Sequence, residues 1–284
     1  MTNLRIIHSN VADRAVLTAS SQVAALGPAN LQMDRKSAVL RAAGITQTIT
    51  ATWPTQEVMA CVALFYTNLT STARMRVRGY AQPGDAVAVL DTGWTQPCRE
   101  APLGTYPFGE LPLGWNAYTW GGANNWGAGA GSDLVAWFAA VLVRQLVIEV
   151  TGIDTPGGYI EMSRLVVGNY WTPEYNASYG ASVQLQNTSE PYRTSAGTTK
   201  TTSGTASRKL SVELEHLTPP DRARLMQILR ACGPSRPLMF SLFPENADSV
   251  LEQDHMIYGR VANLGAVSTP YYDGYSTPLE IEGI

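Results

Sequence analysis

The chain has 284 residues, enough for one large or two ordinary domains. Its net charge of −3 excludes a strong electrostatic attraction to nucleic acid or anionic membranes, so neither is expected as a partner. Charged residues make up 15% of the chain, below the usual ~25%, which indicates that much of the surface is buried in an assembly or lies in large uncharged loops.

Membrane insertion, export and metal binding are not expected either. No run approaches the ~20 apolar residues that cross a bilayer, and the N-terminal sequence MTNLRIIHSN lacks the pattern of a signal peptide. Cys61, Cys98 and Cys232 form no CxxC pair and no metal-ligand spacing with histidine. We therefore expect free thiols from a reducing cytoplasm, and neither a metal nor a cofactor.

Short strands are predicted along the first half of the chain. They cover residues 4–8, 45–53, 58–66 and 73–80. The run VMACVALFY at 58–66 is continuously apolar and is expected to be a central core strand. In ARMRVRGY at 73–80, Met75 and Val77 alternate with arginines, which predicts a half-buried strand. The arginines on its other face, Arg74, Arg76 and Arg78, could meet an acidic partner, but a solvated strand face is the default interpretation.

A large loop rich in glycine and aromatic residues is predicted at 91–137. It holds five of the seven tryptophans and has little hydrophobic periodicity. Long loops in compact domains usually carry function or make contacts. The favoured interpretation is that its aromatic residues pack on their own domain or on a neighbouring subunit, and the alternative is a glycan site. The candidate contact residues are Trp115, Asn116, Tyr118, Trp120, Asn124, Asn125 and Trp126.

A domain boundary is predicted near residue 170. The apolar, β-branched runs 141–150 and 160–167 are separated by turn residues and are expected to be neighbouring strands. Gly168, Asn169 and Pro173 then end the second run. Residues 1–170 are therefore expected to form a jelly-roll β-sandwich, and residues 171–284 a second domain.

The second domain is predicted to be an α+β sandwich with one packed helix, so the predicted fold class of the whole chain is mainly β. A helix is predicted at 219–232, with Thr218 as its N-cap and Gly233 after its end. A long Thr/Ser/Gly hairpin at 189–207 is expected to be flexible. Further strands are predicted around 183–185 and at 210–214, 237–243, 256–264 and 276–284.

No catalytic constellation is recognisable, so no enzyme activity is expected. The chain has no GxSxG, HExxH or phosphate-binding glycine loop, and its three histidines fall in separate segments. Carboxylates near the aromatic loop could supply the acid pair of a glycosidase, although solvated carboxylates are the usual finding in polar loops. These carboxylates are Asp85, Asp91, Glu100, Glu110 and Asp133.

The order of segments resembles a known family. The motif PANL at 28–31, followed by DRKSAVLR at 34–41 and the two strands 45–53 and 58–66, looks like the discoidin-like, galactose-binding-type jelly roll of minor tail proteins of long-tailed bacteriophages. The matching residues are Asn30, Leu31, Asp34, Ser37, Arg41 and Asn68. RLVVGNYWTPEYNASYG at 164–180 is similar to the linking segment of these proteins, and the hairpin, capped helix and later strands are similar to their tail-tube-like domain.

The resemblance implies a structural protein of the phage tail tip or baseplate, made in the bacterial cytoplasm and located at the tail tip of the virion. It would be an adaptor between the tail tube and the tip hub, with tube, tape-measure and hub proteins as partners. We expect a homo-oligomeric ring, with sixfold symmetry as first choice and threefold as second. The alternative function is a glycan-binding module for host surface polysaccharide, and a tail-associated hydrolase is the least favoured.

Overall fold

The computed structural model describes residues 2–70, 73–97, 133–153, 155–187, 189–195, 197–202, 204, 206–246 and 249–284. The chain forms two compact units. Unit 1 comprises Met1–Thr2, Ser9–Trp171 and Phe243–Gln253, and unit 2 comprises Asn3–His8, Thr172–Leu242 and Asp254–Ile284. Each unit is therefore built from segments that are distant in sequence. A single boundary near residue 170 does not account for Asn3–His8, which belongs to unit 2, or for Phe243–Gln253, which belongs to unit 1.

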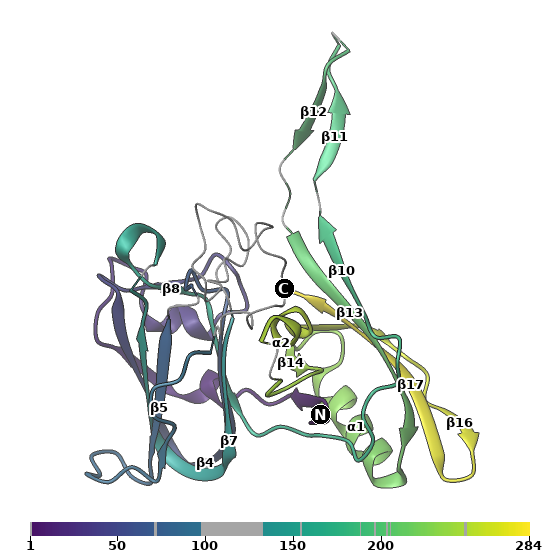
Figure 1. Cartoon of the computed structure of the whole chain (residues 1–284), viewed down its shortest axis with the longest axis horizontal. Coiled ribbons are helices and arrows are strands. Elements are labelled where there is room, and N and C mark those ends of the chain that lie inside the picture. Colours follow the sequence, from purple (N-terminus) through teal and green to yellow (C-terminus); the bar gives the residue numbers. More distant parts are fainter. Residues whose placement is uncertain are drawn as a thin grey trace, which may run out of the picture. The chain divides into compact units, whose positions relative to one another are not determined.

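The fold class is mainly β, as predicted, and unit 1 is a curled antiparallel sheet of the jelly-roll type (Figure 1). Its main sheet runs in the order β2-β4-β7-β5-β6, with β9 also paired to β4, and β3 pairs with β8 separately. Its strands are β2 (Val16–Ala19), β3 (Leu40–Arg41), β4 (Thr46–Phe65), β5 (Arg74–Tyr80), β6 (Leu90–Asp91), β7 (Leu134–Thr151), β8 (Glu161–Met162) and β9 (Arg164–Gly168). Its short helices are η1 (Val11–Arg14), η2 (Pro28–Gln32), η3 (Pro156–Gly158) and α2 (Ser249–Asp254).

Strands β4 and β7 are the centre of unit 1. The two strands predicted at 45–53 and 58–66 are one strand of 20 residues, β4. Its register against β7 shifts between Thr52 and Glu57, where Pro54 lies in an exposed stretch. A β-bulge bends a strand, and a proline, which has no N–H, is tolerated at a bulge. Strand β4 therefore continues past Pro54, although the predicted strand 45–53 ends just before this proline.

The expectation that the runs 141–150 and 160–167 are neighbouring strands is wrong. The second run forms β8 and β9, and β9 pairs with β4, from Cys61↔Gly168 to Phe65↔Arg164. The C-terminal half of β7 is already flanked by β4 on one side and β5 on the other. The chain that leaves β7 must therefore pair elsewhere. Strand β5 agrees with its prediction, because Met75 and Val77 are fully buried on one face.

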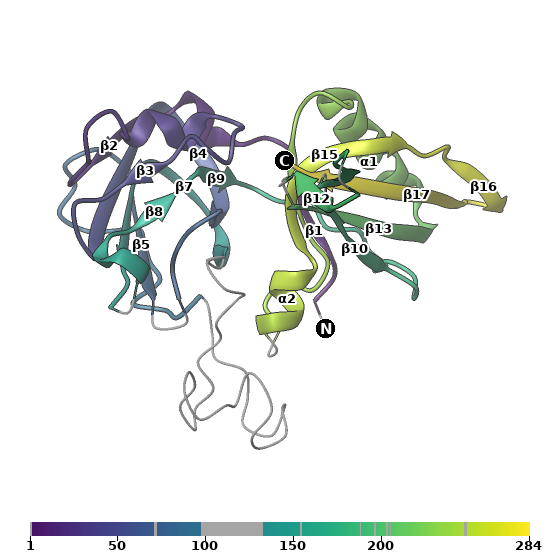
Figure 2. The ribbon, with the colours of Figure 1, turned by 90° about the horizontal axis from the view of Figure 1, so that it is seen from above.

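Unit 2 is a sheet in the order β1-β14-β15-β17-β13-β10, with β16 paired to β17 (Figure 2). Residues 4–8 do form a strand, but it belongs to this sheet and not to the jelly roll, because Ile6 pairs with Phe240 of β14. The strands are β1 (Arg5–Ile7), β10 (Ser182–Asn187), β11 (Glu190–Arg193), β12 (Thr199–Thr202), β13 (Ala206–Leu217), β14 (Leu238–Ser241), β15 (Met256–Leu264), β16 (Ser268–Tyr271) and β17 (Gly274–Gly283).

Helix α1 (Pro219–Cys232) occupies the range that its sequence signals indicate. The Thr218 hydroxyl accepts a hydrogen bond from the Asp221 N–H, and Gly233 follows the last turn with a φ of 54°. Both are local signals, which explains why they could be recognised without the fold. The apolar side of α1, with Leu225 and Ile228 buried, contacts β13, β15 and β17.

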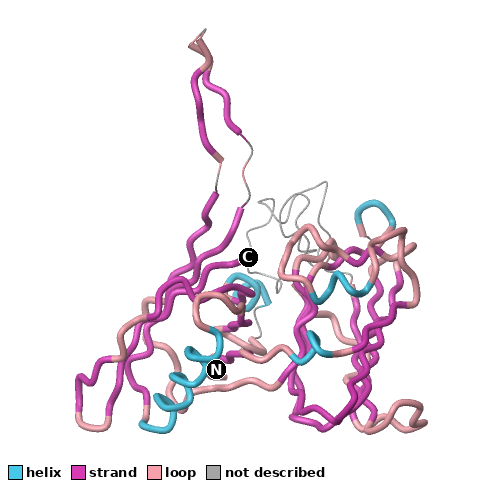
Figure 3. The backbone as a smooth tube through the Cα atoms, turned by 180° about the vertical axis from the view of Figure 1, so that it is seen from behind, coloured by secondary structure: helices cyan, strands magenta, loops and turns pink. Residues whose placement is uncertain are grey.

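The Thr/Ser/Gly hairpin contains a two-stranded ribbon, in which β11 pairs with β12 from Glu190↔Thr202 to Arg193↔Thr199 (Figure 3). Every residue of these two strands is exposed. The ribbon is thus held by backbone hydrogen bonds without a hydrophobic core of its own.

Candidate functional site

Unit 1 contains a cavity of about 410 Å³, within the usual range of about 300–1,000 Å³ for small-ligand pockets. Its lining comes from three places in the sequence: strand β6 and the residues after it, the start of β7, and the segment that comprises Glu245, Asn246 and helix α2. The lining residues are Leu90, Asp91, Thr92, Thr95, Gln96, Pro97, Val135, Ala136, Trp137, Phe138, Glu245, Asn246 and Glu252. The lining therefore combines the aromatic residue Trp137 with residues that carry carboxylate and amide groups.

Trp137 is held in the cavity wall from two sides. Its indole Nε1 donates a 2.9 Å hydrogen bond to Oε1 of Glu252. Its ring meets the ring of Tyr170 edge-on, with 5.5 Å between centroids and an interplanar angle of 88°. The register of β4 against β7 shifts between Met59 and Cys61, opposite the residues that follow Trp137. Bulges of this kind re-aim side chains and are common beside binding sites.

Asp91 brings a fixed negative charge to the cavity. The Arg76 guanidinium donates two hydrogen bonds to its carboxylate, of 2.9 Å from Nε and 2.5 Å from Nη2, and the Gly93 N–H donates a third of 2.9 Å. The Arg76 hydrogen bonds, followed by that of Gly93, lower the pKa of Asp91 to about 2. The carboxylate is therefore ionised at neutral pH and can only accept hydrogen bonds.

The segment Phe243–Gln253 is fastened to the start of β7. The Asp133 N–H donates a 3.1 Å hydrogen bond to Oε1 of Gln253, and Nε2 of Gln253 donates to the Asp133 carbonyl oxygen. The carboxylate of Asp133 accepts a 2.8 Å hydrogen bond from the Tyr66 N–H. Asp133, one of the carboxylates considered for catalysis, is thus a buried structural group.

The predicted contact residues of the aromatic loop lie outside the described residues, and so do Glu100 and Glu110. The described residues on either side of the range 98–132 nevertheless both reach the cavity, because Pro97 and Val135 line it. The expected loop 91–137 is also too long, since Asp91 ends β6 and Leu134–Trp137 begin β7. Sequence reasoning missed Glu252, which lies 115 residues from Trp137, and no local pattern signals that pairing.

The arginines of β5 are mostly committed within their own sheet. Arg76 pairs with Asp91, and Arg78 pairs with Glu149 of β7 at 3.0 Å. Arg74 is exposed, whereas Arg76 and Arg78 are partly buried. The expected row of solvated cations is therefore largely neutralised by carboxylates on the neighbouring strands β6 and β7.

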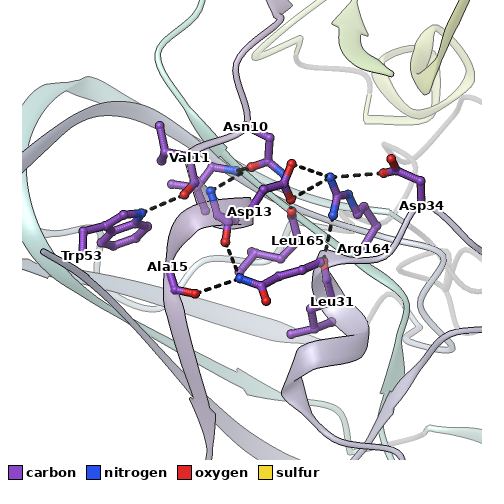
Figure 4. Close-up of polar contacts among 12 residues, drawn as sticks. Asn10, Val11, Asp13, Ala15, Leu31, Asp34, Trp53, Arg164 and Leu165 are labelled. Carbon is purple, nitrogen blue, oxygen red and sulfur yellow. Dashed lines mark hydrogen bonds and ion pairs between the residues drawn. The ribbon is translucent and has the colours of Figure 1, made fainter. Parts of the chain in front are cut away.

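Several residues that carry the phage-tail resemblance form a structural network around Arg164 (Figure 4). The buried Arg164 side chain forms ion pairs with Asp13 at 2.8 Å and Asp34 at 3.1 Å. It also donates to the Leu31 carbonyl oxygen at 3.4 Å. Burial is the main reason why the pKa of Asp13 is raised, and Arg164 opposes that rise. This network ties η1 and η2 to β9.

The remaining motif residues act in a similar way where contacts are described. The Asn30 side-chain amide donates to the Val39 carbonyl oxygen at 2.7 Å. Arg41 pairs with Glu161 of β8. The Asn68 side chain accepts from the Glu161 N–H at 2.8 Å and donates to the Tyr159 carbonyl oxygen at 2.9 Å. These residues hold loops in place and do not converge on the cavity.

Among the described residues, no group of three or more His, Cys, Asp or Glu side chains is placed to hold a metal ion. In the same part of the chain, no helix has the length and apolar character needed to cross a membrane. Cys61 and Cys232 are buried and form no disulfide bond, and Cys98 lies outside the described residues.

No protein-family model and no curated protein matches the sequence. Solved structures give distant matches to carbohydrate-binding modules. Chitosan-binding module 1 of a chitosanase/glucanase from Paenibacillus sp. IK-5 is 17% identical, covers 57% of this chain and 100% of its own, and has a TM-score of 0.37. A family 32 module of Clostridium perfringens NanJ, in complex with galactose, is 9% identical, covers 58% and 99%, and has a TM-score of 0.36.

A fucosidase from Ruminococcus gnavus, in complex with fucose, is 12% identical, with 58% of this chain and 27% of that chain covered and a TM-score of 0.38. TM-scores below about 0.4 are too low to transfer a ligand or an activity to this chain. Its function has to be argued from its own residues.

Proposed function

We propose that unit 1 is a glycan-binding module that takes a neutral sugar in the cavity beside Trp137. The observation that carries this proposal is the composition of the cavity wall. Trp137 supplies flat apolar surface, while Asp91, Gln96 and Asn246 supply polar groups around it. Ligand sites typically combine an apolar lining with a few placed polar groups, and a sugar ring has both an apolar face and a rim of hydroxyls.

The charge of the cavity favours a hydroxyl-rich neutral ligand over an acidic one. The ionised Asp91 carboxylate accepts hydrogen bonds, for which sugar hydroxyls are suitable donors. Arg76 offsets the charge of Asp91, but Glu245 and Glu252 also line the cavity, so an acidic sugar would meet further carboxylates at short range. Catalysis is not required for this function, and Asp91 itself is committed to Arg76.

The experiment is a calorimetric titration of the full chain with a panel of neutral hexose and N-acetylhexosamine oligosaccharides. Trp137→Ala should weaken binding by at least about tenfold, because the aromatic surface is lost. Trp94→Ala is the matched control, since Trp94 is 49% exposed but does not line the cavity. Absence of binding to every member of the panel would refute the proposal, and so would equal losses in both variants.

A second candidate function is that of a structural protein in a phage tail tip, for which the hairpin of unit 2 is the specific observation. Strands β11 and β12 are exposed throughout, and β10 is an edge strand on which Leu185 is 76% exposed. An ordered, exposed ribbon costs conformational entropy, and exposed strand edges pair readily with another chain. A neighbouring subunit of a sixfold or, as second choice, threefold ring would supply that partner.

Deletion of Thr194–Thr205 tests this second function. The sheet and α1 of unit 2 are untouched, so the subunit should fold, while ring formation measured by native mass spectrometry should be lost. Gold labelling of intact virions should place the chain at the tail tip, beside tube, tape-measure and hub proteins. Normal rings from the deletion variant would contradict the role of the hairpin.

A further inference from the structure

We propose that Glu252 is a positioning residue that orients Trp137 for the sugar, so that a segment from the C-terminal part of the chain sets the affinity of the cavity. This inference rests on the proposed glycan-binding function of unit 1. It concerns a residue that does not need to touch the sugar, because it acts through the indole N–H of Trp137.

Trp137 needs a fixed orientation if a sugar is to stack on it, because a flat contact is lost when the ring turns. The hydrogen bond of 2.9 Å to Glu252 fixes one edge of the indole, and the edge-on contact with Tyr170 restricts it on another side. Two independent contacts therefore define the direction in which the Trp137 ring faces.

Glu252 is itself anchored. Glu252 is buried, with only 8% of its surface exposed. The next residue, Gln253, is 4% exposed and exchanges two hydrogen bonds with the backbone of Asp133. Asp133 lies directly before β7, the strand that carries Trp137. Trp137 and Glu252, the donor and the acceptor of the indole hydrogen bond, are thus both fixed to the backbone at the start of β7.

The contact requires only a hydrogen-bond acceptor at position 252. The indole N–H can only donate, so Glu252 acts as an acceptor, and an amide oxygen at the same place can accept equally well. Glu252→Gln should therefore preserve the orientation of Trp137. Glu252→Ala removes the acceptor and leaves the N–H to find another partner. Trp137→Phe removes the donor while an aromatic face remains.

The experiment combines calorimetry with NMR of the 15N-labelled full chain, using the oligosaccharide of the neutral panel that binds the wild type most tightly. Glu252→Ala should shift the indole N–H resonance of Trp137, which Trp137→Phe identifies by its disappearance. It should also weaken sugar binding by about three- to tenfold, the usual effect of one such hydrogen bond. Glu252→Gln should leave both the indole N–H resonance of Trp137 and the sugar affinity near their wild-type values.

The double variant separates positioning from general destabilisation. In the Trp137→Phe background, Glu252→Ala should cause no further loss of affinity, because the interaction is already absent. Glu57→Ala is the matched control, since Glu57 pairs with Arg14 at 2.7 Å and does not line the cavity. Wild-type affinity in Glu252→Ala, or an equal loss in both backgrounds, would overturn the proposal while glycan binding stands. A wild type that binds no sugar would overturn the proposed function and this inference with it.

Discussion

The side chain of Gln253 exchanges hydrogen bonds with both backbone polar groups of Asp133, although 120 residues separate them. Both residues are buried, at 4% and 5% exposure. The amide of Gln253 satisfies an N–H and a carbonyl at the point where the chain enters β7, much as a neighbouring strand would. The pairing makes the C-terminal segment Phe243–Gln253 part of the framework of unit 1.

Gln253→Ala should therefore lower the free energy of unfolding by about 2–4 kcal/mol, because two buried backbone groups lose their partner. Urea denaturation followed by fluorescence measures this change. Gln227→Ala is the control, because Gln227 is exposed on α1 and its loss should cost less than about 0.5 kcal/mol. Equal stabilities of the two variants would contradict the structural role of Gln253.

Trp53 anchors the core of unit 1 to the N-terminal segment. It is 1% exposed, and its Nε1 donates a 2.7 Å hydrogen bond to the Val11 carbonyl oxygen. Trp53→Ala should cost about 3–5 kcal/mol, the range for large buried aromatic residues. Trp53→Phe should cost about 1–3 kcal/mol, because the Val11 carbonyl remains buried without its donor. Trp94→Phe, at an exposed position, should be nearly neutral in the same denaturant titration.

The ion pair of Asp91 with Arg76 predicts a stability change in acid. The pKa of Asp91 is lowered from an ordinary value of 3.8 to about 2 in the folded chain. The pair therefore contributes stability above the unfolded pKa, and this contribution is lost as the pH falls through the folded pKa. The side chains are partly exposed, so solvent screening keeps the effect small.

Asp91→Asn should flatten the dependence of unfolding free energy on pH between about 4 and 2. The measurement is a series of thermal or urea unfolding curves across this window. Asp273→Asn, at an exposed turn, serves as control and should keep the wild-type slope. An unchanged slope in Asp91→Asn would show that this pair does not contribute to the acid transition.

The β11–β12 hairpin should be the first site of proteolysis in the monomer. Arg193 and Lys200 are exposed on its two strands, and exposed polar tips are preferred sites of nicking. Limited trypsin digestion should cut after these residues before it cuts either core. The double variant Arg193→Gln/Lys200→Gln should remove the early cleavage. Protection of the hairpin in isolated monomers would argue against this prediction.

Local patterns determined much of the secondary structure. Helix α1 could be placed from Thr218 and Gly233, because capping acts within one turn of the residues concerned. The alternation of Met75 and Val77 with arginines likewise predicts one buried and one outer face of β5. These features depend on neighbours in sequence and on the backbone periodicity alone.

Only the tertiary structure decided which segments pair and where a site arises. The pairing of β9 with β4, the placement of β1 in unit 2 and the Gln253–Asp133 contact join residues that are distant in sequence. Hydrophobic and hydrogen-bonding patterns say that a strand needs a partner, but several partners satisfy the same pattern. The cavity beside Trp137 depends on such a choice, because Glu252 reaches it from another part of the chain through the packing of the folded unit.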